Sequence, residues 1–242
     1  SLNEKVLPTI SQTTISSDNT SIDVTFSEAV YNTNGGTGDL EVADFVLSIS
    51  GGTASLSQST PSSISISGNV YTLVLPLTGT ADGSEIITVN PAVDSIYNGT
   101  GNIISTSQSN NTISLNDKVF PTISQTTISS DNISINVTFN ETVYNTNGGT
   151  GDLEVSDFVL SISGGQATLS QSTPSSISIS GNVYTLVLPL TGTADGSEII
   201  TVNPAVDSIY NGTGNIISTS QSNNTISLND KVFPTISQTT IS

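Results

Sequence analysis

Short runs of alternating apolar and polar residues recur along the chain and predict β-strands. In residues 21–27, Ile22, Val24 and Phe26 alternate with three polar residues, and a period of two places the apolar side chains on one face of a strand. No stretch shows a sustained helical period. The other segments that predict strands begin at Val6, Asp44, Ser84 and Asn111.

Residues 63–77 predict a hairpin. Ile64 and Ile66 alternate with serines, a turn follows at Gly68 and Asn69, and alternating apolar residues resume at Tyr71. A short Gly- and Asn-containing connection between two alternating runs is typical of an antiparallel hairpin.

The whole pattern occurs twice. Residues 114–226 repeat residues 1–113 with nine differences, and residues 227–242 repeat 114–129 unchanged. A period of 113 residues is the size of an independent domain. We therefore predict one domain at 1–113, a second at 114–226, and at 227–242 the first strand of a third, which packs on or is exchanged with a neighbour.

Each predicted domain contains about seven or eight short strands, which favours an all-β fold. Strands of this number in about 100 residues, separated by Gly-, Asn- and Asp-rich turns, are typical of an immunoglobulin-like β-sandwich. The predicted fold class is therefore a tandem array of immunoglobulin-like β-sandwiches with a 113-residue repeat.

Several motifs, in the same order and spacing in both repeats, carry a resemblance to a family. In the first repeat they are Pro8, Val24–Val30, Asp44-Phe45, Tyr71–Leu73, Glu85–Val89, and Asp94 leading to Gly101-Asn102; in the second they are Val137–Val143, Asp157-Phe158, Tyr184–Leu186, Glu198–Val202, and Asp207 leading to Gly214-Asn215. The chain resembles the bacterial immunoglobulin-like (Big-type) domains arrayed in giant extracellular surface proteins and adhesins. The resemblance implies a spacer, an adhesin stalk or a surface fibre. One departure is Asn98, which stands where such domains often have an Asp, and this weakens the case for calcium.

Composition excludes several classes of function. The chain has a net charge of −17, only three Lys, and no Arg, His, Cys, Met or Trp, while Ser and Thr make up about a third of its residues. There is therefore no disulfide, no zinc–thiolate site and no Ser-His-Asp triad, and we expect no enzyme. Nucleic acid and membrane insertion are disfavoured as well. Without an initiator Met or a signal peptide, we expect a mature or excised segment of a longer array.

Acidic residues suggest calcium as the one cofactor to consider, although none is required. Calcium prefers carboxylate and carbonyl oxygens on flexible loops. The alternatives are a solvated loop whose acids cap turns, and a short polar linker. An interdomain site could also recruit Asp82, Glu85 or Asp94. The candidate ligands are Asp39, Glu41 and Asp44 in one acidic loop, Asp152, Glu154 and Asp157 in its counterpart, and Glu4, Asp117 and Asp230 in the linkers.

The sequence contains candidate residues for two kinds of covalent modification. Lys5, at the start of the first strand, could form an amide bond with Asn110 or Asn111 of the last strand, but a solvated linker charge is the simpler interpretation. The N-glycosylation pattern occurs eight times, about as often as this composition predicts by chance. The candidate sites are Asn19, Asn98, Asn110, Asn132, Asn136, Asn140, Asn211 and Asn223.

We expect a structural spacer or stalk of a long extracellular or cell-surface protein, an adhesin rod or a fibre, whose main partners are neighbouring repeats. The alternative is a calcium-dependent or glycan-binding adhesion module with a glycan or cell-surface partner. Near-identical neighbours are also prone to exchange strands. Two arrangements therefore remain open, a string of separate sandwiches and a strand-exchanged filament.

Overall fold

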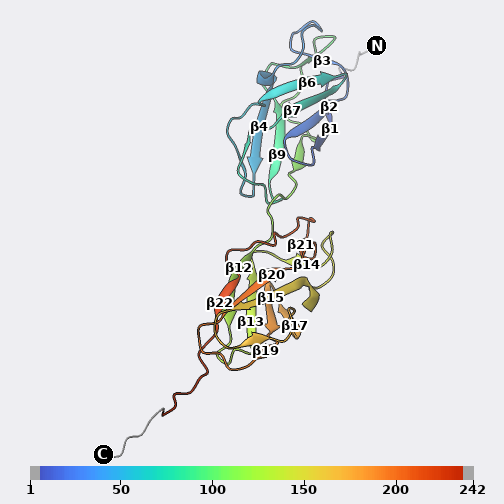
Figure 1. Cartoon of the computed structure of the whole chain (residues 1–242). Helices are drawn as coiled ribbons and strands as arrows, with labels where there is room; N and C mark the ends of the chain where they lie inside the picture. Colours follow the sequence, from blue (N-terminus) through green and yellow to red (C-terminus); the bar gives the residue numbers. More distant parts are fainter. Residues whose placement is uncertain (1–5, 237–242) are drawn as a thin grey trace, which may run out of the picture. The chain divides into compact units, whose positions relative to one another are not determined.

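The computed structural model describes residues 6–236, and the chain divides into two compact units, Ser1–Val119 and Phe120–Ser242 (Figure 1). Within the described residues the only helices are two single 3₁₀ turns, η1 (Val42–Asp44) and η2 (Val155–Asp157). The strands of the first unit are β1 (Ile10–Ile15), β2 (Ser21–Phe26), β3 (Val30–Tyr31), β4 (Phe45–Ser50), β5 (Ser55–Leu56), β6 (Ser63–Ser67), β7 (Val70–Val74), β8 (Leu77–Thr78), β9 (Ile86–Pro91), β10 (Tyr97–Asn98) and β11 (Thr112–Ser114).

Two antiparallel sheets make up the first unit. One has the strand order β1-β2-β7-β6 and the other β11-β9-β4, while β10-β3 and β5-β8 form short two-stranded ribbons. The predicted hairpin is present, because β6 pairs with β7 in regular register from Ser63↔Val74 to Ser67↔Val70. The longer predicted strands are confirmed. The two-residue strands were not predicted, because they are too short to show alternating apolar and polar residues.

The core lies between the two sheets. Val24 of β2 and Leu73 of β7 are buried with Leu47 of β4 and Val89 of β9 in one hydrophobic cluster. Phe26 and Tyr71 add an edge-to-face contact with ring centroids 5.2 Å apart, a geometry that aromatic rings favour. Side chains from both inner faces thus close a β-sandwich, and the predicted all-β class is confirmed.

The second unit contains the corresponding elements 113 residues later. Its main sheets have the orders β12-β13-β18-β17 and β15-β20-β22. The strands are β12 (Ile123–Ile128), β13 (Ser134–Phe139), β14 (Val143–Tyr144), β15 (Phe158–Ser163), β16 (Thr168–Leu169), β17 (Ser176–Ser180), β18 (Val183–Val187), β19 (Leu190–Thr191), β20 (Ile199–Pro204), β21 (Tyr210–Asn211) and β22 (Thr225–Ser227).

The structural boundary falls later than the boundary read from the repeat. β11 runs to Ser114 and pairs with β9, Leu115 is buried in the core of the first unit, and the Lys118 N–H donates to the Ala81 carbonyl at 2.8 Å. Residues 114–118 therefore complete the first unit, although the sequence repeat begins at Ser114. A repeat boundary marks where a sequence was copied, and a domain ends where its core is closed.

The same correction applies to the C-terminal stretch 227–242. Leu228 is buried in the core of the second unit, and the Lys231 N–H donates to the Ala194 carbonyl at 2.8 Å. Residues 227–231 thus complete the second unit rather than begin a third. The segment that corresponds to β12 lies almost wholly outside the described residues.

The first strand of each unit stays in its own unit. β1 pairs with β2 from Ile10↔Phe26 to Ile15↔Ile22, and β12 pairs with β13 in the same register. Exchange of these strands between the two repeats is therefore not the arrangement of this chain. No helix among residues 6–236 is long and apolar enough to cross a bilayer.

Candidate functional site

The chain enters each unit at one end of the sandwich and leaves at the other (Figure 1). We call these the incoming end and the outgoing end. In the first unit β2 connects them, running from just after Asn19 to just before Glu28. Six residues of strand span about 20 Å. Polar side chains hold the backbone at both ends, and these are the candidate functional sites.

At the incoming end, Asn98 is the centre of a hydrogen-bond network. Its side-chain oxygen accepts the N–H groups of Thr100 and Asn102 at 3.1 and 2.8 Å. Its amide donates to the Glu28 carboxylate at 3.2 Å, and Asn102 donates to the Val6 carbonyl at 3.2 Å. The incoming chain is therefore bonded to the loop that follows β10.

At the outgoing end, Asn19 and Asn116 form a reciprocal pair, which we call the asparagine clasp. The Asn19 side chain donates to the Asn116 carbonyl at 2.7 Å and accepts the Asn116 N–H at 2.9 Å. Asn19 is buried and has a φ of 62°, a region in which asparagine is better tolerated than most residues. Asn132 and Asn229 repeat the clasp at the same two distances. No local sequence pattern marks the clasp, because its partners lie 97 residues apart.

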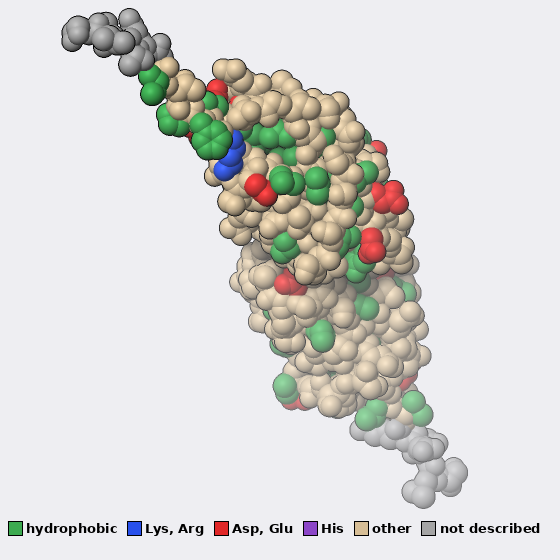
Figure 2. All heavy atoms as spheres, turned by 90° about the horizontal axis from the view of Figure 1, so that it is seen from below, with side chains coloured by type: hydrophobic (Ala, Val, Ile, Leu, Met, Phe, Trp, Pro, Cys, Tyr) green, Lys and Arg blue, Asp and Glu red, His purple; other side chains and the backbone are tan. Residues whose placement is uncertain are grey.

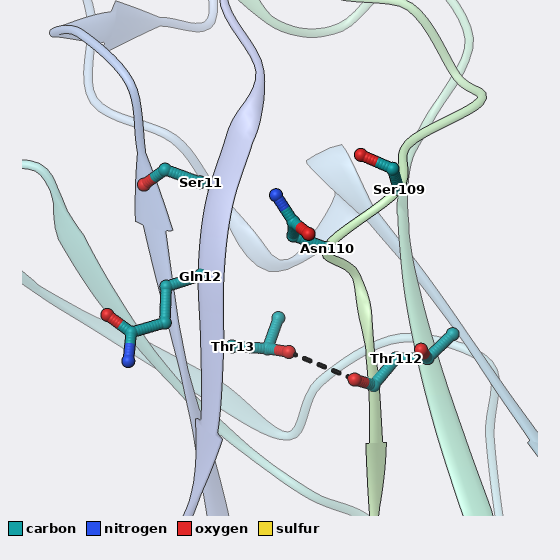
Figure 3. A pocket seen from close by; sticks show the side chains of 6 residues that line it. All are labelled: Ser11, Gln12, Thr13, Ser109, Asn110 and Thr112. Atoms are coloured by element: carbon teal, nitrogen blue, oxygen red, sulfur yellow. Dashed lines mark hydrogen bonds between the residues drawn. The ribbon is translucent and has the colours of Figure 1, made fainter.

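The first and last strands of the unit lie side by side and run in the same direction, from the incoming toward the outgoing end. The Thr13 hydroxyl of β1 donates to the Thr112 carbonyl of β11 at 3.3 Å (Figure 3). Nearby, the Ile10 N–H donates to the Gln108 side-chain oxygen at 2.8 Å. Between these contacts is a shallow polar groove into which Asn110 points (Figure 3).

Glu85 is a buried carboxylate that joins two loops. Its Oε1 accepts the N–H groups of Thr53 and Ala54 at 2.8 Å each. Its Oε2 accepts the N–H groups of Asp82 and Gly83, both at 3.1 Å. The loops after β4 and before β9 thus converge on one side chain. Because N–H donors surround both oxygens, Glu85 is not available to the interdomain calcium site that the sequence suggests.

The pKa of Glu85 reflects this environment. Burial by itself raises the pKa of a carboxyl, but the backbone hydrogen bonds outweigh it, so the pKa of Glu85 is lowered. The same causes lower the pKa of Glu198 to about 2. The packing also requires glycine at position 52, since a Cβ there would lie 2.1 Å from the Glu85 Cδ.

The acidic loop does not gather its carboxylates. Asp44 is buried, and its carboxylate accepts the Glu41 N–H at 2.7 Å, which closes the 3₁₀ turn η1. Burial, with a smaller contribution from the Glu41 charge, raises the pKa of Asp44 although the Glu41 N–H bond opposes it. Asp39 and Glu41 are exposed. The same arrangement recurs in the second unit, where Asp157 accepts the Glu154 N–H at 2.7 Å and Asp152 is exposed.

The linker acids also bond to backbone. Asp117 and Asp230 accept the N–H groups of Val119 and Val232, each at 2.8 Å, while Glu4 lies outside the described residues. In residues 6–236 no three His, Cys, Asp or Glu side chains come together in a way that could hold a metal ion. Four of the nine candidate calcium ligands thus act in this fold as acceptors of backbone N–H groups: Asp44, Asp117, Asp157 and Asp230.

Burial divides the eight candidate glycosylation sites into two groups. Four asparagines are buried and could not carry a glycan in the folded units, so their assignment is corrected: Asn19, Asn98, Asn132 and Asn211. An attached glycan needs its amide nitrogen at the surface. The other four are exposed and stay candidates: Asn110, Asn136, Asn140 and Asn223.

The lysine crosslink stays a prediction, because Lys5 lies outside the described residues. Its counterpart Lys118 lines a shallow hollow at the outgoing end together with Asp18. Of the two proposed acceptors, Asn111 is buried and donates to the Val89 carbonyl at 3.0 Å and to the Asn90 side chain at 2.7 Å.

Comparisons with known proteins show no family. Neither a protein-family model nor a curated protein matches the sequence. One solved structure, a chimeric titin Z1Z2 carrying an exogenous peptide from decorin, is 15% identical with a TM-score of 0.20 over 83% of this chain and 91% of its own. A TM-score this low carries no argument about fold or function.

Proposed function

We propose that the chain is a structural spacer, a segment of the stalk or rod of a long extracellular repeat protein such as an adhesin or a surface fibre. The observation that carries the proposal is that the chain enters and leaves each unit at opposite ends, with polar side chains bonded to the backbone at both. A domain with this path adds its own length to an array. The resemblance to Big-type domains and the near-identical repeats support the same function.

The arrangement of the first and last strands suits a chain under tension. Pulling on the two ends draws β1 toward the incoming end and β11 toward the outgoing end, so the parallel strands are loaded along their length. The Thr13–Thr112 and Ile10–Gln108 bonds are then strained together instead of one after the other. A spacer built in this way transmits force while its core stays closed.

The test is to join two, four and six repeats and to measure the maximum dimension by small-angle X-ray scattering. We expect the dimension to rise linearly with repeat number. Pulling the same chains one molecule at a time should give regular unfolding steps of roughly 350 Å, the extended length of one unit minus its folded length. A maximum dimension that stays nearly constant as repeats are added would contradict the proposal.

A pair of variants tests the mechanical part. Gln108→Ala removes the Ile10–Gln108 bond between the two ends of the chain and should lower the unfolding force of the first unit. Gln58→Ala is the matched control, because Gln58 bonds only to nearby Thr60 and Pro61. Equal unfolding forces for the two variants would show that the Ile10–Gln108 bond carries no load.

A further inference from the structure

Each unit presents one outer strand whose free edge has no partner among the described residues. In the first unit this is β6, the last strand in the order β1-β2-β7-β6, and in the second it is β17. Both read Ser-Ile-Ser-Ile-Ser. The outer strand of the other sheet differs, because β4 is partly covered where the Leu47 N–H donates to the Ser59 carbonyl at 2.7 Å.

Backbone hydrogen bonds on the inner side of β7 define which groups of β6 are free. The Phe26 N–H donates to the Asn69 carbonyl at 3.0 Å, and the Leu75 N–H donates to the Thr20 carbonyl at 2.9 Å. Odd-numbered residues of β7 therefore bond toward β2. Because bonding direction alternates along an antiparallel strand, the even-numbered residues of β7 bond toward β6.

The register of the hairpin identifies which residues of β6 bond to β7. The β6 partners of Val70, Thr72 and Val74 are the three serines of the strand. The N–H and C=O groups of Ile64 and Ile66 consequently point away from the sheet. A second strand could bond to these four groups without disturbing the existing ladder.

The usual protections of an edge strand are absent from β6. Natural edges are commonly blocked by charged side chains, proline or a bulge. Residues 63–67 contain neither charge nor proline, and their pairing with β7 is regular. Ile66 and its counterpart Ile179 are each 41% exposed.

The sequence of the edge is self-complementary. Residues 63–67 read the same in both directions, so two copies can pair antiparallel about a two-fold axis at Ser65. Ile64 then lies opposite Ile66 of the second copy. This register makes the two isoleucines a hydrogen-bonded pair, because their N–H and C=O groups are the ones that point away from β7. Four hydrogen bonds form, and the half-exposed isoleucine side chains meet across the new pair.

We propose that β6 and β17 are lateral association strands, each pairing with the same edge of a second copy of this chain. Charge favours this occupant. Two copies with a charge of −17 each repel one another and can meet only where both are neutral, and most of the face in Figure 2 carries uncharged side chains. An array with one such edge per repeat would gain avidity from weak individual contacts.

The test uses the absence of cysteine from the chain. At the two-fold axis Ser65 faces itself in a non-hydrogen-bonded pair, whose Cα separation of about 4.5 Å is within disulfide range. Ser65→Cys should form a covalent dimer under mild oxidation at least tenfold faster than Thr14→Cys. Thr14 is exposed on β1 at the opposite margin of the same sheet and is the matched control.

A second pair of variants tests the uncrosslinked protein by sedimentation velocity up to millimolar concentration. The unmodified chain should associate reversibly, and more strongly as salt screens the charge. Ser65→Lys with Ser178→Lys should weaken association at least tenfold, whereas Thr14→Lys with Thr127→Lys should not weaken it comparably. Equal crosslinking of the two cysteine variants, or a monomer at every concentration, would overturn the proposal. Neither result would affect the length test of the spacer function.

Discussion

The buried carboxylate of Glu85 provides the sharpest test of how each unit is held together. We consider Glu85→Gln, which keeps the size of the side chain and replaces one acceptor oxygen with a donor NH₂ group. In either orientation of the amide, its NH₂ group faces backbone N–H groups that bond to a carboxylate oxygen in the unmodified protein. With the amide nitrogen in the Oε2 position, the Gly83 N–H, 3.1 Å away, loses its acceptor, and the Asp82 N–H keeps only its longer bond to Oε1 at 3.3 Å.

The expected magnitude comes from these two bonds. A hydrogen bond to a charged group contributes about 1.5–3 kcal/mol, so losing one of these bonds and weakening the other lowers the free energy of unfolding by about 2–5 kcal/mol. Domains of this size are stable by only about 5–15 kcal/mol. For about 113 residues the melting temperature of the first unit should fall by roughly 10–20 °C.

Differential scanning calorimetry measures this directly, because the second unit keeps Glu198 and acts as an internal reference. The unmodified chain should melt in one transition or in two close ones, and Glu85→Gln should move only the first unit to lower temperature. Glu41→Gln, the same chemical change at an exposed position, is the control. If Glu85→Gln melts within about 2 °C of the control, the carboxylate does not hold the two loops and the reasoning is refuted.

Three further predictions follow from the other polar sites. The folded-state pKa of Glu198, about 2, lies below the ordinary glutamate value of 4.5, so its stabilisation is present above pH about 4.5 and is lost as the pH falls toward 2; Glu198→Gln should flatten that part of a stability–pH curve. The pKa of Asp44 is raised in the folded state, so ionisation of this carboxyl lowers the free energy of unfolding as the pH rises. Asp44→Asn should therefore leave the stability at pH 7 unchanged or higher. If Asp44→Asn instead lowers the melting temperature more with calcium present than with a chelator, Asp44 is a calcium ligand. Asn19→Gly and Asn19→Ala both remove the side chain of the asparagine clasp, but only glycine tolerates the φ of 62° without strain. In chemical denaturation, Asn19→Ala should therefore be less stable than Asn19→Gly by about 1 kcal/mol. Equal stabilities of the two variants would show that backbone strain at this position contributes nothing.

The strands could be predicted from the sequence because their signal is local. Ile22, Val24 and Phe26 alternate with polar residues, and alternation by itself decides which side chains share a face. The identical spacing of two repeats then predicts two domains of one fold. The error at the boundary has a physical origin, since the burial of Leu115 depends on where the first core has room and not on where the copied sequence begins.

The sites were harder to predict because their partners are distant in sequence. Asp39, Glu41 and Asp44 looked like a ligand cluster from spacing alone, but the fold buries Asp44 as a turn acceptor and leaves the other two exposed. Neighbours in sequence need not converge in space, and no local pattern distinguishes an acid that binds a cation from one that accepts N–H groups.

The sequence by itself determined the all-β class, the faces of the longer strands and the absence of thiol and imidazole chemistry, because these depend on composition and on neighbours one or two residues away. Only the tertiary structure decided that Asn19 bonds to Asn116, that Glu85 joins two loops, and that the backbone groups of Ile64 and Ile66 are left free. Each of these depends on which distant segments the closed core brings together, and that is settled when the two sheets pack.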